Sequence, residues 1–342
     1  MRRRGATLLV GVVVLIALVL GSFEGIKVPY VELGPGPTWN TLGSSNGKQL
    51  IAISGGSTSD SKGQLRMVTV GVVDQISLWQ AIQGWLSPND AVVPREVIYP
   101  PDRTQQQVDQ QNQEDFKDSQ SSAETAALRE LGYPVQVTVQ SVVAGQPAAG
   151  HLNAGDVINT VDGQKVTSAQ KLTSLIKAKP VGTALAVGYS RAGTPGSTTI
   201  TSSKGDDGKP RIGIEVAQKQ PSPFTITFSL DDVGGPSAGM MFSLGIVDKL
   251  SPGDLTGGLN IAGTGTIDDE GNVGAIGGIA QKMRGAKRDG ATVFLAPADN
   301  CAEAEQNAVP GLELVKVKTL NDALNDLSAL RDHKTPTLCS AR

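Results

Sequence analysis

The feature that most constrains this chain lies at its beginning. Three arginines at positions 2–4 precede "GATLLVGVVVLIALVLGSF", an uncharged run over residues 5–23. About 20 apolar residues in a helix span the hydrocarbon core of a bilayer, and positively charged flanks stay in the cytoplasm. We therefore expect residues 1–24 to form a cytoplasmic tip and one transmembrane helix, with the rest of the chain outside the cytoplasm. A cleaved signal peptide would begin in the same way, but no A-x-A-like site follows the run, which favours a retained anchor.

Scarce residue types exclude several classes of site. Charged residues make up 18% of the 342-residue chain and the net charge is −3, so no basic surface indicates nucleic-acid binding. Two histidines, His151 and His333, and two cysteines, Cys301 and Cys339, are too few for a His/Cys zinc site, and we predict neither a metal nor a cofactor. Outside the cytoplasm the two cysteines could form a disulfide, and the sequence leaves this pairing open.

Residues 25–128 form a membrane-proximal region of mixed character. Its first part, 26–64, is rich in Gly, Pro, Ser and Asn and predicts turns and extended backbone. A strand is predicted over 65–73 and a short amphipathic helix over 77–86. The polar, Gln-rich residues 101–125 are typical of either a solvated helix or a loose linker, and composition does not decide between them.

The pattern of residues 129–218 predicts several strands and one helix. Val135, Val137 and Val139 alternate as in a half-buried strand, and "AGDVINTVDGQKV" predicts two strands joined by a tight turn at Asp162-Gly163. A helix follows in "SAQKLTSLIKA", where Leu172, Leu175 and Ile176 share one face.

The run "GQPAAG", "LNAGDVI" and "VDGQKV" resembles a PDZ domain in its bacterial strand order. The resemblance implies a mainly β domain that binds extended peptides by strand addition. Only Leu131–Tyr133 stands where the family has its carboxylate-binding loop. A PDZ fold that serves only as a spacer is the alternative.

A serine follows a strand and two glycines after residue 220. "PFTITFSL" alternates as a half-buried strand and runs into "DDVGGPSAGMMFSLGIVD", residues 231–248. Gly234 and Gly235 permit a sharp turn, and Pro236 suits the first turn of a helix. Ser237 then lies at a helix N-terminus, where free backbone N–H groups favour an oxyanion. The alternative is that Ser237 only caps the helix.

A lysine lies on the apolar face of the next predicted helix, in "AIGGIAQKMRGAKRDG" (275–290). Ile279, Met283 and Ala286 mark the buried face by their spacing, and Lys282 shares it. Burial lowers the pKa of a lysine toward neutrality, as a general base requires. The alternative is a lysine whose head group extends past its neighbours to water.

Three separated motifs, "GGPSAG", "GTGTIDDEGNVGAIGGIAQK" and "TVFLAPADN", resemble the proteolytic domain of the Lon proteases in order and spacing. The resemblance implies that Ser237 is the nucleophile and Lys282 its base, that Thr264 hydrogen-bonds near the lysine, and that Gly235 and Pro236 support the turn. The family often has an acidic residue where Gly234 stands here, and the nearest carboxylates are those of Asp231 and Asp232.

The complete layout resembles the membrane-anchored PDZ–Lon proteins of bacteria. No G-x-x-x-x-G-K-[ST] motif occurs in the chain, so no ATPase is predicted within it. The resemblance implies an ATP-independent serine endopeptidase that cuts flexible or unfolded protein segments outside the cytoplasm; homo-oligomers remain open. The rival from another class is a non-catalytic PDZ scaffold with an inactive Lon-type domain. A Ser-His-Asp site would need His151, in the PDZ segment, or His333, in a polar tail.

The expected fold is an α/β (α+β) Lon-type proteolytic domain over 219–332 followed by a tail, 333–342, together with the PDZ domain and the anchor. The strand and helix of 64–86 have no place in a PDZ fold and demand an apolar partner. We expect them to pack against 220–330, with the PDZ domain inserted between. The alternative is that 64–86 form a small membrane-proximal lobe of their own.

Overall fold

The computed structural model describes residues 25–45, 47–205, 207–230 and 233–339. The chain divides into two compact units: unit 1 is Met1–Ala126 with Ile226–Arg342, and unit 2 is Ala127–Thr225. Within the described ranges, no helix has the length and apolar character needed to cross a bilayer. The transmembrane helix expected in residues 1–24 lies outside the described residues.

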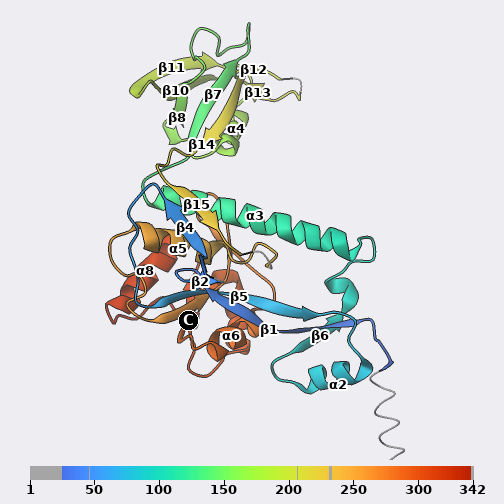
Figure 1. Ribbon diagram of the computed structural model, residues 1–342. Coiled ribbons are helices and arrows are strands. Elements are labelled where there is room, and N and C mark those ends of the chain that lie inside the picture. Colours follow the sequence, from blue (N-terminus) through green and yellow to red (C-terminus); the bar gives the residue numbers. More distant parts are fainter. Residues whose placement is uncertain (1–24, 46, 206, 231–232, 340–342) are drawn as a thin grey trace, which may run out of the picture. The chain divides into compact units, whose positions relative to one another are not determined.

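A six-stranded mixed sheet forms the centre of unit 1 (Figure 1). Its strands are, in spatial order, β20 (Glu313–Val317), β19 (Val293–Pro297), β16 (Asn260–Gly263), β5 (Gln64–Val73), β1 (Tyr30–Asn40) and β6 (Ala91–Pro94). β5 pairs parallel to β16 and antiparallel to β1. The strand predicted over 65–73 therefore lies in one sheet with the segment that follows residue 220.

Helices cover both faces of this sheet. The helices of unit 1 are α2 (Leu78–Leu86), η1 (Arg95–Val97), α3 (Gln105–Glu130), which continues into unit 2, α5 (Gly239–Leu250), α6 (Ile279–Arg288), η2 (Ala298–Asn300), α7 (Cys301–Gln306) and α8 (Leu320–Arg331). Val68, Phe294 and Ala296 face α6 and share its core. On the other face, Gly263 leaves room for the Met241 side chain of α5. Every α5 residue from Gly239 to Asp248 is buried.

Strand β1 is longer and more regular than its Gly/Pro-rich sequence indicates. Its pairing with β5 shifts register between Pro35 and Thr38, as in a β-bulge. Proline is tolerated in a strand at a bulge because it has no N–H to contribute to the ladder. Residues 30–40 of the stretch predicted as turns and extended backbone are therefore one long strand with a bulge.

The helix predicted over 77–86 is α2. Ser77 caps it, with the reciprocal side-chain contact from Gln80 that makes a capping box. The helix packs against β1 and β6, at the end of the sheet, rather than against the elements after residue 220. Strand β5 thus supplies the pairing that was expected of the whole 64–86 segment.

Short strand pairs complete unit 1. They are β2 (Ser44–Ser45) with β3 (Lys48–Gln49), β4 (Ile51–Ser54) with β15 (Thr225–Phe228), and β17 (Thr266–Ile267) with β18 (Val273–Gly274). The strand predicted in "PFTITFSL" is β15, and its pairing with β4 is a second link between the two halves of unit 1.

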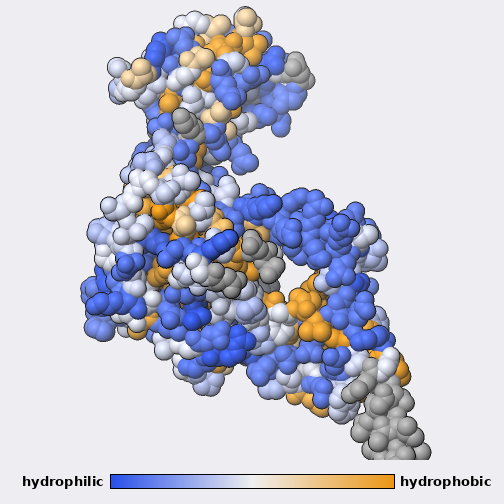
Figure 2. Space-filling view, in the orientation of Figure 1, coloured by the Kyte–Doolittle hydropathy of each residue, from blue (hydrophilic) through white to orange (hydrophobic). Residues whose placement is uncertain are grey.

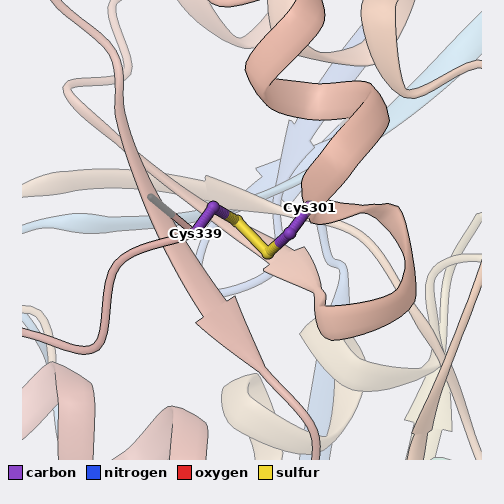
Figure 3. Close-up of a disulfide and its surroundings, with 2 residues drawn as sticks. All are labelled: Cys301 and Cys339. Atoms are coloured by element: carbon purple, nitrogen blue, oxygen red, sulfur yellow. A yellow bond between two sulfur atoms is a disulfide. The ribbon is translucent and has the colours of Figure 1, made fainter. Parts of the chain in front are cut away.

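The C-terminal residues as far as Cys339 lie against β20. The Lys316 N–H donates to the Thr337 carbonyl, and the Cys339 N–H donates to the Leu314 carbonyl. A disulfide joins Cys339 to Cys301 at the start of α7 (Figure 3). The segment expected to be a polar tail is thus fixed to the sheet over its described part.

Unit 2 is a small β domain with its own core. Its sheet runs in the order β11 (Thr194–Thr201), β10 (Ala184–Arg191), β8 (Val157–Val161), β7 (Gln136–Val142) and β14 (Ile214–Lys219); β9 (Gln164–Lys165) pairs with β8, and β12 (Ser203–Lys204) pairs with β13 (Pro210–Arg211). Of the described helices, α4 (Ala169–Lys177), capped by Ser168, lies wholly within unit 2, which also contains the last turn of α3. The predicted buried face of this helix, Leu172, Leu175 and Ile176, is confirmed.

Candidate active site

Ser237 lies in a turn directly before α5. Gly235 in this turn has a φ of 83°, a conformation that glycine adopts far more easily than other residues. The helix begins at Gly239, with Ala238 as its N-cap residue and no side-chain cap. Pro236 therefore precedes the first helical turn rather than occupying it, and the alternative that Ser237 serves as the cap is wrong. Ser237 remains beside the N-terminus of α5, where backbone N–H groups favour negative charge.

Lys282 is the fourth residue of α6 and is 3% exposed. The predicted apolar face, Ile279, Met283 and Ala286, is completely buried around it. Desolvation lowers the pKa of Lys282 to about 7. The alternative in which the head group reaches bulk water is wrong.

Thr264 connects the serine and the lysine. It directly follows β16, and its hydroxyl accepts a hydrogen bond from Lys282 Nζ (3.0 Å) and donates to the Ser237 carbonyl (3.0 Å). The same carbonyl accepts from the Gly265 N–H (2.9 Å). The Nζ hydrogen bond thus goes to Thr264 rather than to the Ser237 hydroxyl, and Thr264 fixes the lysine relative to the serine backbone.

Ser237 and Lys282 line one open cavity of about 440 Å³. Its other lining residues are Pro37 and Trp39 of β1, Thr69, Val70 and Gly71 of β5, and Val233, Gly234 and Gly277. None of these described lining residues carries a carboxylate or an imidazole. Strands β1 and β5 therefore form part of the wall, although they lie far from Ser237 in the sequence.

The other candidate residues lie elsewhere or outside the described chain. His151 is in unit 2, where its Nδ1 pairs with Thr198, and His333 follows α8. Neither lines the cavity, which disfavours a Ser-His-Asp site. Asp231 and Asp232, the carboxylates closest in sequence, lie outside the described residues. Among the described residues no cluster of His, Cys, Asp or Glu could hold a metal ion.

Sequence reasoning missed two supports of the site. Asn300, in the third Lon-like motif, exchanges two hydrogen bonds with the backbone of Ile276 and so holds the loop before α6. Helix α3 holds the turn before Ser237: the Asn112 carbonyl accepts from the Gly235 N–H (2.7 Å), and the Ser119 hydroxyl donates to the Pro236 carbonyl (3.0 Å). A single aromatic residue in the polar run, Phe116, was the available signal for this contact.

Unit 2 has a groove beside its edge strand. The cavity, of about 240 Å³, is lined by Leu172 and Ile176 of α4 and by the stretch Pro210–Ile214 that enters β14. β14 ends the described strand order of its sheet, so one of its edges has no strand partner there. Leu131–Tyr133, the segment expected to replace the carboxylate-binding loop, does not line this groove.

Two families match separate parts of the chain. Residues 107–201 match the PDZ domain family, and residues 232–329 match the Lon protease (S16) C-terminal proteolytic domain. The first match contains most of unit 2, and the second contains Ser237, Thr264 and Lys282.

Curated relatives are similar over slightly more than a quarter of the chain. Lon protease 1 of Sorangium cellulosum is 40% identical over 102 residues, which are 28% of this chain and 12% of the relative. Lon protease 2 of Bacillus subtilis is 34% identical over 97 residues, which are 28% of this chain and 17% of the relative. The chain thus spans less than a fifth of the length of these relatives.

A solved PDZ domain, that of the SdrC-like protein of Listeria monocytogenes, is 33% identical, with a TM-score of 0.23, and covers 23% of this chain and 85% of that one. By its two family matches, the chain contains one segment similar to PDZ domains and one similar to the proteolytic domain of Lon proteases. The Lon-type similarity supports a serine peptidase.

Proposed function

We propose that the chain is an ATP-independent serine endopeptidase with Ser237 as nucleophile and Lys282 as general base. One observation carries the proposal: a buried lysine with a pKa of about 7 lines the same cavity as a serine that precedes a helix N-terminus. A lysine in this state is largely neutral at mildly alkaline pH and can accept a proton.

The proposed reaction uses the two residues in sequence. Neutral Lys282 donates one N–H to Thr264, which leaves its lone pair for the Ser237 hydroxyl. As Ser237 Oγ bonds to the substrate carbonyl carbon, its proton passes to Nζ, and the oxyanion forms close to the N-terminus of α5. The ammonium then protonates the leaving amine. Water, deprotonated by the same lysine, then attacks the carbonyl carbon of the acyl-enzyme ester. The bond to Ser237 Oγ breaks, and Oγ takes the proton back from Nζ, which restores the hydroxyl and the neutral amine.

Flexible or unfolded segments are the proposed substrates. Ser237 is only partly buried, and the cavity opens between β1, β5 and the serine turn. The chain has no P-loop motif for an unfolding motor. We therefore propose substrates whose backbone is already extended.

The test compares Ser237→Ala, Lys282→Ala and the double variant on an unstructured peptide. Each single variant should abolish cleavage without lowering the melting temperature. The double variant should be no worse than either, because the two residues act as a unit. Lys287→Ala is the matched control, since that lysine lies on the same helix but bonds the Gly311 carbonyl. Substantial cleavage by Lys282→Ala would overturn the assignment, and an inactive wild-type protein would favour the scaffold function.

We also propose that unit 2 binds an extended peptide by strand addition. The free edge of β14 offers backbone groups for a new strand, and the neighbouring apolar groove offers space for side chains.

We propose further that the N-terminal run anchors the protein in a membrane, with both units outside the cytoplasm. Exposed apolar side chains gather where the described chain begins, at the end of the sheet that carries α2 and β6 (Figure 2). This apolar end comprises Ile26, Val72, Val73, Trp85, Leu86 and Val97. The Trp85 ring packs edge-on against Tyr30 of β1, and the Ile26 carbonyl accepts from the Leu78 N–H at the start of α2. The Cys301–Cys339 disulfide also suits an oxidising compartment.

The anchor and the apolar end can be tested separately with the full chain in phosphatidylcholine vesicles. Flotation with the vesicles tests the anchor. Quenching of a fluorophore on Leu86→Cys by nitroxide lipid tests the apolar end, and Val181→Cys in unit 2 is the matched exposed site. Flotation without quenching at position 86 would overturn the second part alone.

A further inference from the structure

Helix α3 contacts the catalytic turn and α5 through a single face. Asn112, Phe116, Ser119 and Ala123 recur at intervals of four, three and four residues, the spacing of one face of a helix. Their contacts follow in order: the Asn112 carbonyl to Gly235, the Phe116 ring to Phe242, the Ser119 hydroxyl to Pro236, and the Ala123 carbonyl to the Ser243 hydroxyl. Phe116, Ser119 and Ala123 are buried, whereas Asn112, at the outer end of this face, is exposed.

Two of these contacts fix the backbone directly before Ser237. The Pro236 carbonyl belongs to the peptide plane that joins Pro236 to Ser237, so the Ser119 hydroxyl sets the orientation of that plane. On the other side of the residue, Gly265 and Thr264 hold the Ser237 carbonyl. The serine is thus held by hydrogen bonds to the backbone on both sides.

The sequence around the serine makes such support necessary. Gly234 and Gly235 give the turn more backbone freedom than any other residue pair would. A reacting serine must keep its Oγ aligned with the base, and a misplacement of about 1 Å costs on the order of 100-fold in rate. Residues outside the turn must therefore restrict it.

We propose that Ser119 is a positioning residue for the reaction: its hydroxyl fixes the Pro236–Ser237 peptide plane and thereby directs Ser237 Oγ toward Lys282. The inference rests on the proposed Ser-Lys function. Ser119 lies outside residues 232–329, which match the Lon proteolytic domain, and neither contacts Lys282 nor lines the cavity. It acts through the backbone alone.

Close packing limits which substitutions are informative. The Ser119 Oγ lies 2.9 Å from the point where a Cβ on Gly239 would stand, so a larger side chain at position 119 would displace α5. Alanine removes only the hydroxyl and raises helix propensity slightly. Ser121→Ala is the matched control, because Ser121 is an exposed serine on the same helix.

The test measures peptide cleavage by full-length Ser119→Ala and Ser121→Ala, with active sites titrated. We expect Ser119→Ala to lower kcat at least tenfold with KM within twofold of wild type, and to slow acylation of Ser237 by a serine-directed phosphonofluoridate in parallel. The pH midpoint should stay unchanged, because the environment of Lys282 is intact. Ser121→Ala should match wild type in every measurement.

Specific results would overturn the positioning role. They are a kcat equal to that of Ser121→Ala, a shifted pH midpoint, or a loss explained entirely by a smaller folded fraction. Retained activity in Ser237→Ala would instead overturn the proposed function itself, so the two failures are distinguishable.

Discussion

At the residue scale, the burial of Lys282 costs stability, and the same burial suits this lysine to the proposed role of general base. The side chain is 3% exposed, and a single neutral hydroxyl, that of Thr264, accepts its hydrogen bond. The neutral Thr264 hydroxyl does not balance the positive charge of an ammonium ion. Lys282 therefore loses its proton at a lower pH than a lysine in water does. The same physics predicts how activity and stability change with pH.

Peptide cleavage should rise with pH and reach half of its maximum near the pKa of Lys282, about 7. Below this pH the lysine is an ammonium ion and has no lone pair to accept the serine proton. The measurement is kcat/KM for an uncharged peptide between pH 5.5 and 9.5. An optimum below about pH 6 would instead indicate a carboxylate base.

Replacing the lysine should stabilise the fold. Its pKa is about 7 in the folded protein and about 10.4 in the unfolded chain, so between these values the unfolded chain binds one proton more. The stability of the wild type therefore rises with pH in this range, by up to about 1.4 kcal/mol per unit. Below pH 7 both states are protonated, and the burial cost is at its full value.

Lys282→Met should accordingly unfold at a higher temperature than wild type near pH 6, and the difference should shrink toward pH 10. Thermal unfolding at pH 6, 8 and 9.5 checks this, with Lys287→Met as the control on the same helix. A difference that does not change with pH would contradict the burial of a charged lysine as its cause.

The sequence predicted Ser237, Thr264 and Lys282 because each stands in a short pattern, and the structure joins all three. It did not predict a role for Ser119, because nothing in the polar sequence around this serine indicates that it is buried. Only the pairing of α3 with the turn, more than 110 residues away in sequence, gives this serine a partner.

At the scale of elements, prediction succeeded where one periodicity dominated. Helices α2, α4 and α6 follow their apolar spacing, and β5 follows its β-branched run. Strand β1 was less clear because Gly and Pro signal turns, and here a bulge in a sheet accommodates them. Helix α3 was left open because its buried face is narrow and half polar.

The disulfide between α7 and the C-terminal residues can be removed by mutation, and its contribution to stability can be measured directly. The Cys301–Cys339 disulfide closes a loop with a sequence separation of 38, which corresponds to about 4 kcal/mol in the chain-entropy account. We expect the Cys301→Ser/Cys339→Ser variant to melt roughly 10 °C lower than wild type. Cleavage at 25 °C should persist, since neither cysteine lines the cavity.

Dithiothreitol provides the control for this prediction. It should lower the melting temperature of the wild type toward that of the double variant and leave the double variant unchanged. Equal melting temperatures for the two proteins under oxidising conditions would show that the bond contributes no stability.

At the scale of the whole molecule, the active-site sheet is built from two distant parts of the chain. Apolar residues in the segment before the PDZ-like unit indicated a missing partner, and β5 pairs with β16. The sequence could not show that β1 and β5 also supply cavity walls, because only the folded sheet brings Trp39 and Val70 near Ser237.

If the chain is divided into fragments, we therefore expect the PDZ-like unit to fold alone and the segment after residue 218 not to fold alone. Fragment 219–342 lacks β1 and β5, so one edge of β16 would have no strand partner. The buried faces of α5 and α6 would also lose their contacts with β5. Leu65, Met67 and Val68 of that strand are each no more than 2% exposed in the intact chain. We expect this fragment to be insoluble or to unfold without cooperativity, and to cleave no peptide. Fragment 127–225 keeps its own core of buried residues from β7, β8, α4, β10 and β11, so it should fold cooperatively alone. We would measure thermal unfolding and peptide cleavage of both fragments, with the full chain as reference. A fragment 219–342 that folds and cleaves as the full chain does would show that β5 is dispensable and that the sheet is not a shared structure.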